Sequence, residues 1–245
     1  MTAALYSCYL KLTDTDWSPM KAMILAAGRG ERMRPLTDAR PKTLLEAGNR
    51  ALLDYPLAAL AAGGIEQVVI NLAWQGQQIR DFVGDGSRWG LDAQFSDEGS
   101  AALETGGGIH QALPLLGSEA FWLVNADVFS DYVFRPAQLA PGVLAHLVLV
   151  PNPPHNPQGD FRLVEGLVAT GAGQRLTYSG LAIIDPALLR DCAPGRFPLA
   201  PLLTAAAEQG AITGELFDGI WTDVGTPERL AELDARLLAR PQTSR

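Results

Sequence analysis

The chain has 245 residues, of which 47% are hydrophobic and 19% are charged. This composition is that of a globular protein and excludes a disordered chain or a coiled coil, and the length suits one large α/β domain or two small ones. Nineteen basic against 27 acidic residues leave a formal charge of −8. That balance argues against nucleic acid as a partner, because binding its backbone requires a basic surface.

The chain carries few groups that could form a disulfide framework or a zinc site. Its two cysteines, Cys8 and Cys192, are far apart, and its three histidines follow no ligand spacing. No apolar run approaches the roughly 18 residues that span a bilayer, and the first 19 residues lack the basic region and cleavage site of a signal peptide. We therefore expect a cytoplasmic protein with reduced thiols and no membrane partner.

Residues 1–19 are expected to be an extension without a role in the fold, either disordered or the product of an upstream start codon, because Met20 is followed at once by a strand-like run. From there on, apolar runs alternate with helix-period segments, which is the pattern of βαβ units. No repeat, low-complexity segment or shift in composition marks a linker. We therefore expect a single Rossmann-like α/β domain over residues 20–240, with a mostly parallel, mixed sheet flanked by helices.

The expected elements follow from the apolar runs and their stop signals. Strands are expected at 23–26, 67–72, 91–96, 120–125, 146–150, 178–184 and 220–224, with a hairpin at 161–168. Helices are expected at 52–62, 75–83, 108–116, 199–208 and 227–238. The run at 91–96 alternates between apolar and polar residues, which favours a place at the edge of the sheet.

The most informative stretch is the loop after the first expected strand. A small-residue turn at the carboxyl end of a first parallel strand is where open α/β sheets bind nucleotides. Gly28 and Gly30 let backbone N–H groups approach phosphate oxygens. Arg34 can hold such oxygens in a bidentate fork, and Lys42 offers a point charge. The loop therefore indicates a phosphate-binding site.

Two rival nucleotide motifs fail on spacing. A dinucleotide fingerprint needs a small residue where Met33 stands, and the P-loop pattern is absent, so a nicotinamide-dependent oxidoreductase is disfavoured. The stretch from Leu25 to Lys42 reads L-A-A-G-x-G-x-R-[ML]-x-P-L-T…P-K and resembles the signature of the sugar-1-phosphate nucleotidyltransferases. The resemblance continues through residues 20–238, in the family's order, at 84–87, 103–108, 124–127, 159–161 and 221–228.

This resemblance implies a glycosyltransferase-A-like nucleotidyltransferase fold. The activity it implies is transfer of a nucleotidyl group from an NTP to a sugar 1-phosphate, with pyrophosphate released and Mg²⁺ as cofactor. Asp127 and Asp223 each follow an expected strand and match the family's pair of metal-binding aspartates, which are ligands that Mg²⁺ favours. Arg34 and Lys42 are expected to be the catalytic cations: Arg34 would neutralise the departing pyrophosphate and Lys42 would bridge the reacting phosphates.

The resemblance also assigns the binding residues. The family reads the base with a glutamine ahead of a G-D-G turn and with the turn's backbone, which here are Gln77 or Gln78, with Gln77 preferred, and Gly86. The other nucleotide-binding residues expected are Leu25, Ala26, Ala27, Gly28, Gly30, Thr105 and Gly106. Thr105 and Gly106 belong to a glycine-rich segment that passes under the nucleotide in the family. The sugar pocket is expected to include Asn125, Gly159, Asp160 and Gly180.

One departure from the family pattern bears on the sugar phosphate. Many relatives carry Glu-Lys-Pro in the second half, and its lysine meets this phosphate, but no lysine follows Lys42 here. Either Lys42 together with Mg²⁺ holds the sugar phosphate, or an arginine such as Arg162 or Arg175 takes the place of the lysine. An arginine would do so as a rigid fork rather than as a mobile ammonium.

Within the family, the segments 76–79, 84–88, 103–109, 112–117 and 159–164 and the missing Glu-Lys-Pro resemble the uridylyltransferases that act on N-acetylmuramate 1-phosphate in peptidoglycan recycling. We therefore expect UTP, or another NTP, and a sugar 1-phosphate as substrates. The alternatives are a mannose-1-phosphate guanylyltransferase, a glucose-1-phosphate uridylyl- or thymidylyltransferase, and, from a different class, a non-catalytic sugar-nucleotide sensor. The sensor is disfavoured because the arginine, the lysine and both aspartates are present. Monomer and dimer both stay open.

Overall fold

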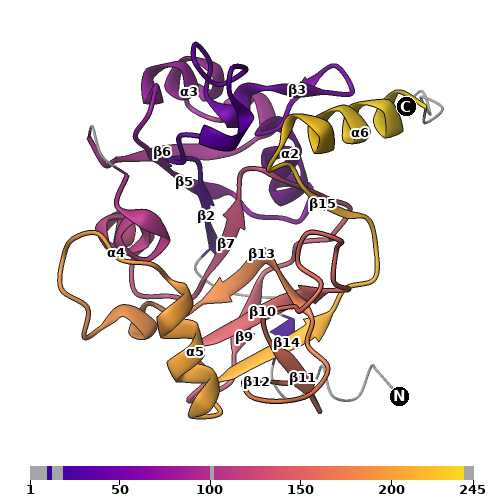
Figure 1. Ribbon diagram of the computed structural model, residues 1–245. Coiled ribbons are helices and arrows are strands. Elements are labelled where there is room, and N and C mark those ends of the chain that lie inside the picture. Colours follow the sequence, from indigo (N-terminus) through magenta and orange to yellow (C-terminus); the bar gives the residue numbers. More distant parts are fainter. Residues whose placement is uncertain (1–9, 13–18, 100–101, 240–245) are drawn as a thin grey trace.

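The computed structural model describes residues 10–12, 19–99 and 102–239. Within these residues nine strands form one mixed sheet, in the order β11-β12-β14-β10-β13-β7-β2-β5-β6 (Figure 1). The strands are β2 (Lys21–Leu25), β5 (Gln67–Leu72), β6 (Asp92–Asp97), β7 (Phe121–Asn125), β10 (Ala145–Val150), β11 (Arg162–Val164), β12 (Leu167–Ala169), β13 (Thr177–Ile184) and β14 (Ile212–Leu216). The expected α/β class is confirmed, and β6 is the edge strand that alternation predicted.

The strands β7, β2, β5 and β6 are parallel to one another, so their carboxyl ends meet at one edge of the sheet. Leu25, the last residue of β2, is in register with Asn71 of β5 on one side and with Asn125 of β7 on the other. This edge therefore gathers side chains from three strands that are far apart in the sequence. On the other side of β7, β13 runs antiparallel to both β7 and β10.

Helices cover both faces of the sheet because successive residues of each strand point to opposite sides. Val68 and Ile70 of β5 face the side covered by α2 (Asp54–Ala62) and α3 (Gly76–Val83). Val69, between them, faces the side covered by α4 (Glu104–Leu116) and α5 (Ala200–Glu208). The two apolar cores that result hold the sheet rigidly, and its carboxyl edge with it (Figure 1).

Three short strand pairs lie outside the main sheet. β3 (Glu46–Ala47) pairs with β4 (Arg50–Ala51), and β8 (Val128–Ser130) pairs with β15 (Trp221–Asp223). The C-terminal helix α6 (Pro227–Leu238) begins four residues after β15 and packs on β3. Its boundaries are those that the sequence predicted.

The third pair joins β1 (Leu10–Leu12) to β9 (Ala137–Leu139) in antiparallel register. These three residues of the N-terminal stretch thus have a partner in the fold, which corrects the expectation that residues 1–19 have none. Residues 1–9 and 13–18, on which the same expectation falls, lie outside the described residues. In the part of the chain that is described, no helix is long and apolar enough to cross a membrane.

Candidate active site

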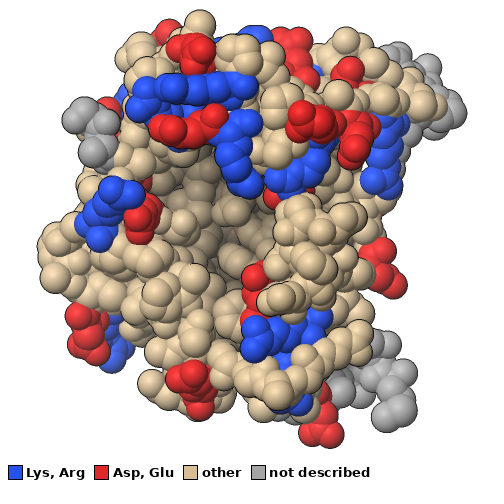
Figure 2. Space-filling view, viewed as in Figure 1, with Lys and Arg blue, Asp and Glu red and all other residues tan. Residues whose placement is uncertain are grey.

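A cavity of about 390 Å³ opens at the carboxyl edge of the parallel strands. Figure 2 shows this face of the molecule hollowed near its centre, with charged side chains around the opening. The cavity is lined by Leu25, Ala26, Ala27, Gly28, Gly30, Glu31, Arg32, Met33, Lys42, Thr43, Asn71, Glu98, Ala102, Glu104, Thr105, Asn125, Asp127 and Gly225. Most of the residues expected at the nucleotide therefore share one space.

The loop after β2 forms one wall of this cavity. A Cβ added to Gly28 would have no atom within 4 Å, so Gly28 leaves open space on the cavity side. Gly30 has a positive φ of 67°, and a Cβ there would lie 2.9 Å from Cβ of Lys42. Gly30 is therefore needed for the turn and for the close approach of the Lys42 side chain. These two reasons are additional to the phosphate contact that the sequence predicted.

Lys42 begins a short 3₁₀ helix (Lys42–Leu44) and reaches across the cavity to Asp127. Its ammonium group forms an ion pair with Oδ2 of Asp127, and the Lys42 side chain is only 11% exposed. Asp127 stands between β7 and β8. The structure thus brings together Lys42, which was expected to bridge the reacting phosphates, and Asp127, which was expected to bind Mg²⁺.

Asp223 lies beside Asp127 because β15 pairs with β8. Asp223 is in register with Val128, and the N–H of Val224 donates to the carbonyl of Asp127 at 2.8 Å. The Asp223 carboxylate accepts from Nη1 of Arg229 at 2.6 Å to each oxygen, and Nε2 of His155 lies 3.0 Å from Oδ1. Asp223 does not itself line the cavity, but Gly225, two residues on, does.

Arg229 is a cation that the sequence analysis missed. It lies in the first turn of α6, and its side chain is only 16% exposed. A Cβ on Gly225 would clash with Nη2 of Arg229 and would lie 3.2 Å from Nη2 of Arg32. The absence of a side chain at Gly225 thus makes room for the guanidinium over Asp223. The run from Asp223 to Arg229, D-V-G-T-P-E-R, was a signal that could have revealed it.

The two aspartates fit a Mg²⁺ ion by the chemistry of their donors. Mg²⁺ takes one or two carboxylates and completes its shell with water and substrate phosphates. Both carboxylates are about a quarter exposed, at 29% for Asp127 and 26% for Asp223, and each attracts a cation. In the described chain, no three His, Cys, Asp or Glu side chains cluster as a complete metal site, so a bound ion would depend on water or substrate oxygens.

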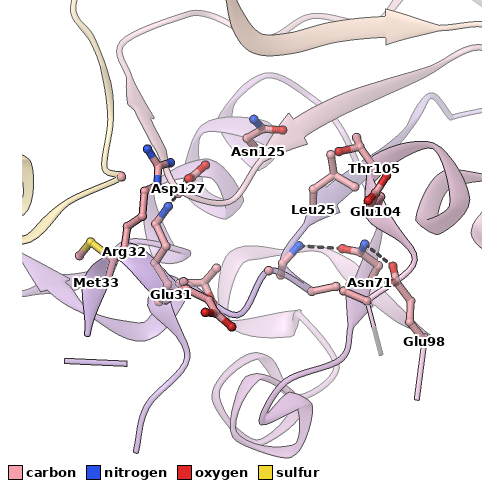
Figure 3. A pocket seen from close by; sticks show the side chains of 18 residues that line it. Leu25, Glu31, Arg32, Met33, Asn71, Glu98, Glu104, Thr105, Asn125 and Asp127 are labelled. Atoms are coloured by element: carbon pink, nitrogen blue, oxygen red, sulfur yellow. Dashed lines mark hydrogen bonds and ion pairs between the residues drawn. The ribbon is translucent and has the colours of Figure 1, made fainter. Parts of the chain in front are cut away.

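The structure does not place Arg34 in the lining of the cavity, and its expected role with pyrophosphate stays a prediction. Arg34 is half exposed, pairs with Asp38 at 3.2 Å and does not line the cavity. Arg32 does line it and lies on the same side as Asp127 (Figure 3). In the motif G-x-G-x-R the arginine is Arg32, two residues after Gly30. The 3₁₀ turn Glu31–Met33 buries Met33. Of the two arginines next to Met33 in the sequence, Arg32 lines the cavity and Arg34 does not.

The residues expected to bind the base, Gln77 and Gly86, also lie outside the lining of the cavity, and their expected role stays a prediction. Gln77 is exposed and donates to Oδ1 of Asp81 at 2.7 Å, within α3. Gly86 has φ 86°, and a Cβ there would lie 2.8 Å from the carbonyl oxygen of Leu91, so the turn before β6 requires this glycine. Neither residue lines the cavity. Gln78, the other glutamine considered, donates to the carbonyl of Ala39 at 3.0 Å. This hydrogen bond connects α3 to the loop after β2, residues 26–41, which we call the glycine loop.

Polar residues from two strand ends fill the side of the cavity away from Asp127 (Figure 3). The Asn71 amide oxygen accepts from the N–H of Ala26 at 2.7 Å, and its Nδ2 donates to Glu98 Oε1 at 2.6 Å. The other oxygen of Glu98 accepts from the N–H of Leu103 at 2.6 Å. The sequence analysis missed Asn71 and Glu98, although both are visible in the sequence as polar residues near the carboxyl ends of expected strands.

Thr105 lines the cavity, whereas Gly106 does not. A Cβ on Gly106 would lie 2.5 Å from the ring of Phe197, and the N–H of Gly107 donates to the carbonyl of Phe197 at 3.0 Å. A Cβ on Gly108 would clash with Glu98. The glycines at the start of α4 are therefore required by close contacts with other segments of this chain, and the nucleotide contact expected of Gly106 stays a prediction.

A second cavity of about 560 Å³ adjoins the first and shares Thr105 and Asn125 with it. It contains Asn125, Gly159 and Asp160, as expected for the sugar side. Gly180 lies behind this wall, where a Cβ would be 2.5 Å from Nδ2 of Asn125. The second cavity is lined by Thr105, Asn125, Gly159, Asp160, Phe161, Thr170, Arg175, Tyr178, Leu199, Ala200, Leu203 and Thr204.

Comparisons with known proteins show which family the chain resembles. The family model described as "Nucleotidyl transferase" matches residues 21–141. The N-acetylmuramate alpha-1-phosphate uridylyltransferase of Neisseria meningitidis is 46% identical, over 88% of this chain and 97% of that protein. The protein of the same name from Caulobacter vibrioides is 34% identical, over 90% of this chain and 98% of that one.

The fold has solved counterparts. The crystal structure of a putative glucose-1-phosphate thymidylyltransferase from Bacillus anthracis superposes with a TM-score of 0.80 at 17% identity, over 92% of this chain and 98% of that one. This likeness confirms the nucleotidyltransferase fold, and the two relatives are similar over nearly their whole length. The chain therefore belongs to the sugar-1-phosphate nucleotidyltransferase family.

Proposed function

We propose that this chain transfers UMP from UTP to N-acetylmuramate 1-phosphate and releases pyrophosphate, as a Mg²⁺-dependent cytoplasmic enzyme of peptidoglycan recycling. The observation that carries the proposal is a pair of adjoining cavities that meet at Thr105 and Asn125, with Lys42 and Asp127 lining one of them. The names of the two relatives that are 46% and 34% identical support the choice of base and sugar.

The nucleotide is proposed to occupy the first cavity. Its triphosphate would lie along the glycine loop, near Arg32 and Lys42, and its base would lie toward Asn71 and Glu98. The sugar would occupy the second cavity, with its phosphate at the junction beside Asn125. This placement brings a sugar-phosphate oxygen toward the α-phosphorus of UTP, and pyrophosphate leaves in line from the other side.

The barrier to this reaction comes from two polyanions that repel each other. Positioning and fixed positive charge lower it, because both act before any bond changes. When bound, Mg²⁺ would supply further positive charge to the reacting phosphates. Asp127 and Asp223 would hold it, and their present counterions, Lys42 and Arg229, would then be free to contact phosphate oxygens. Arg32 would stabilise the departing pyrophosphate.

A substrate panel tests the proposal. The purified protein is incubated with each NTP, a set of sugar 1-phosphates and Mg²⁺, and pyrophosphate release is measured with and without a chelator. We expect release with UTP and N-acetylmuramate 1-phosphate, and its loss on chelation. Release only with GTP and mannose 1-phosphate would make the protein a guanylyltransferase. Tight binding of UDP-sugars without release for any pair would indicate a regulatory protein.

A further inference from the structure

One of the residues that line the second cavity is an arginine, Arg175. Of the residues that line this cavity, the two charged ones are Asp160 and Arg175. N-acetylmuramate differs from N-acetylglucosamine by a lactyl ether that ends in a carboxylate. We propose that Arg175 binds this carboxylate and thereby selects a sugar 1-phosphate whose sugar carries a carboxylate over one whose sugar is uncharged. This inference rests on the proposed function, because it places the sugar in the second cavity.

The guanidinium of Arg175 is available for an anion. It donates from Nε and Nη2 to the carbonyl of Gly171 at 3.3 and 3.0 Å, and it forms no ion pair with any carboxylate of the described chain. A guanidinium presents five N–H donors in a planar fork that matches a carboxylate. Several donors of Arg175 therefore remain free beside the cavity.

Asp160, the other charged residue, is committed elsewhere. Its carboxylate accepts from Nδ2 of Asn156 at 3.2 Å to each oxygen, and from the N–H of Tyr178 at 2.8 Å. These contacts bind the loop before β11 to the start of β13. Asp160 therefore shapes the cavity wall and does not neutralise Arg175.

Two further features of the same cavity favour an anionic, hydrogen-bonding ligand. The hydroxyl of Tyr178 is buried and has no hydrogen-bond partner within the described residues, and a buried donor of this kind is costly unless a ligand satisfies it. The N-terminus of α5 also faces the cavity through Leu199 and Ala200. Among the described side chains none caps this helix. Pro201 has no N–H, and the N–H groups of Leu202 and Leu203 donate to the carbonyl of Leu199, so the helix favours negative charge in the cavity through its dipole.

The two negative groups of the substrate would then be bound by separate cations. Lys42 and Arg32 line the first cavity, where the phosphate would lie, and Arg175 lines the second. A sugar 1-phosphate without a carboxylate on its sugar would leave Arg175 desolvated without a partner, and such a loss discriminates more strongly than a loss of apolar contact. Arg175 is in this sense a specificity-determining residue.

The test compares Arg175→Gln with wild type on two substrates, N-acetylmuramate 1-phosphate and N-acetylglucosamine 1-phosphate. We expect the ratio of their kcat/KM values to fall by about 100-fold or more in the variant, because a charged hydrogen-bonding partner is lost for one substrate alone. Arg175→Lys, which keeps the charge but not the fork, should retain an intermediate ratio. Arg190→Gln is the matched control, since Arg190 is exposed and lines neither cavity, and it should keep the wild-type ratio.

A binding measurement separates specificity from turnover. Calorimetric titration should show that Arg175→Gln weakens the affinity for UDP-N-acetylmuramate much more than that for UDP-N-acetylglucosamine. If the variant keeps the wild-type ratio in both assays while wild type prefers N-acetylmuramate 1-phosphate, the role of Arg175 is wrong and the proposed function stands. If wild type itself prefers a sugar 1-phosphate whose sugar is uncharged, the proposed substrate is wrong and the inference is wrong with it.

Discussion

Lys42 is the residue whose position is most strongly determined. Gly30 leaves space for its stem, a 3₁₀ turn fixes its backbone, and Asp127 pairs with its ammonium group. A side chain that is 11% exposed has little freedom to lose when substrates bind. In the proposed reaction the stem of Lys42 stays held while its ammonium group moves from Asp127 to phosphate oxygens. A cation positioned in this way would supply the electrostatic stabilisation that is usually the largest single term in catalysis.

Replacing Lys42 with Gln should therefore lower kcat by about 10²–10³-fold, the typical cost of removing one preorganised group that stabilises the transition state. The measurement is steady-state pyrophosphate release at saturating UTP. Arg40→Gln is a suitable control, because Arg40 lies two residues away, is exposed and pairs only with Glu46 in the described structure. A Lys42→Gln variant with wild-type kcat would exclude Lys42 from the chemistry.

Arg229 and a metal ion are expected to compete for Asp223. The guanidinium contacts both carboxylate oxygens at 2.6 Å, so a cation that binds there must displace it. Arg229→Gln should tighten the affinity for Mg²⁺ by about fivefold, which corresponds to an ion pair of ~1 kcal/mol. Calorimetry with Mg²⁺ alone measures this without turnover. Weaker binding of Mg²⁺ in the variant would mean instead that Arg229 holds Asp223 in place for the ion.

Asp223→Asn provides the complementary experiment. We expect the fold to be kept, since the amide can still accept from Arg229, and metal-dependent turnover to be lost, since an amide is a poorer ligand for Mg²⁺ than a carboxylate. Circular dichroism and pyrophosphate release at increasing Mg²⁺ report the two effects. Unchanged kinetics would remove Asp223 from the site.

At the scale of elements, the glycine loop and the start of α4 look alike in sequence but differ in what their glycines do. Gly28 faces open space in the cavity, whereas Gly106 is in contact with Phe197. Gly28→Ala should leave the free energy of unfolding within about 0.5 kcal/mol of wild type. It should raise KM for UTP by about 10–100-fold, because the new methyl group separates backbone N–H groups from the phosphates.

Gly106→Ala should have the opposite signature. The added Cβ would lie 2.5 Å from the Phe197 ring and 2.9 Å from its carbonyl oxygen, so backbone must move. We expect a loss of about 1–3 kcal/mol of unfolding free energy and a nearly unchanged KM for UTP in the protein that remains folded. Urea unfolding and initial rates, measured on both glycine variants, distinguish the two roles. Equal effects from the two variants would contradict this distinction.

The sequence predicted well those elements whose hydrophobic pattern and turn residues are uninterrupted. β5 and α6 have the predicted boundaries, and the hairpin β11–β12 turns at Glu165 and Gly166, both with positive φ. α4 begins at Glu104, four residues before its expected start. The sequence did not predict its first turn, because three successive glycines are unfavourable in a helix. β14 was not predicted, since Thr213 and Gly214 interrupt its apolar run, and it is stabilised instead by pairing with β10.

At the scale of the whole molecule, β10 and β14 bring two buried titratable groups together. Nε2 of His146 lies 3.7 Å from Oε1 of Glu215, and the Tyr132 hydroxyl lies 2.5 Å from the same oxygen. Burial raises the pKa of Glu215 to about 7 and lowers the pKa of His146 to about 4. In both cases the interior disfavours the charged form.

These two shifts act on stability in opposite directions. Unfolding releases a proton from Glu215 between pH 4.5 and about 7, so stability falls as pH rises through that window. Unfolding takes up a proton at His146 between about pH 4 and 6.5, so stability falls as pH drops through that window. Where the windows overlap, the two contributions cancel.

Glu215→Gln removes the contribution of Glu215 to the pH dependence of the unfolding free energy and leaves that of His146. The difference in unfolding free energy, wild type minus variant, should fall by about 3 kcal/mol as pH rises from 4.5 to 7, the equivalent of a shift of roughly two and a half pKa units. Urea unfolding at pH intervals measures it, and His146→Gln should show a difference of the opposite slope between pH 4 and 6.5. A difference that does not change with pH would contradict the raised pKa of Glu215.

The sequence by itself determined the class of fold, most element positions and the family. It also placed Lys42, Asp127 and Asp223 at strand ends or in the loop beside them. These features are local, because periodicity, turn residues and the order of motifs are properties of neighbouring residues. A parallel sheet then gathers strand ends at one edge whatever lies between them.

Only the tertiary structure decided which side chains share the cavities. Arg32 lines the first one and Arg34 does not, Asn71 and Glu98 line it whereas Gln77 and Gly86 do not, and Arg175 lines the second. Each of these placements depends on how segments far apart in the sequence pack together, as α3 does on the glycine loop. The spacing of residues in a loop does not predict where an exposed side chain points. The direction in which each side chain points determines whether it can contact a substrate.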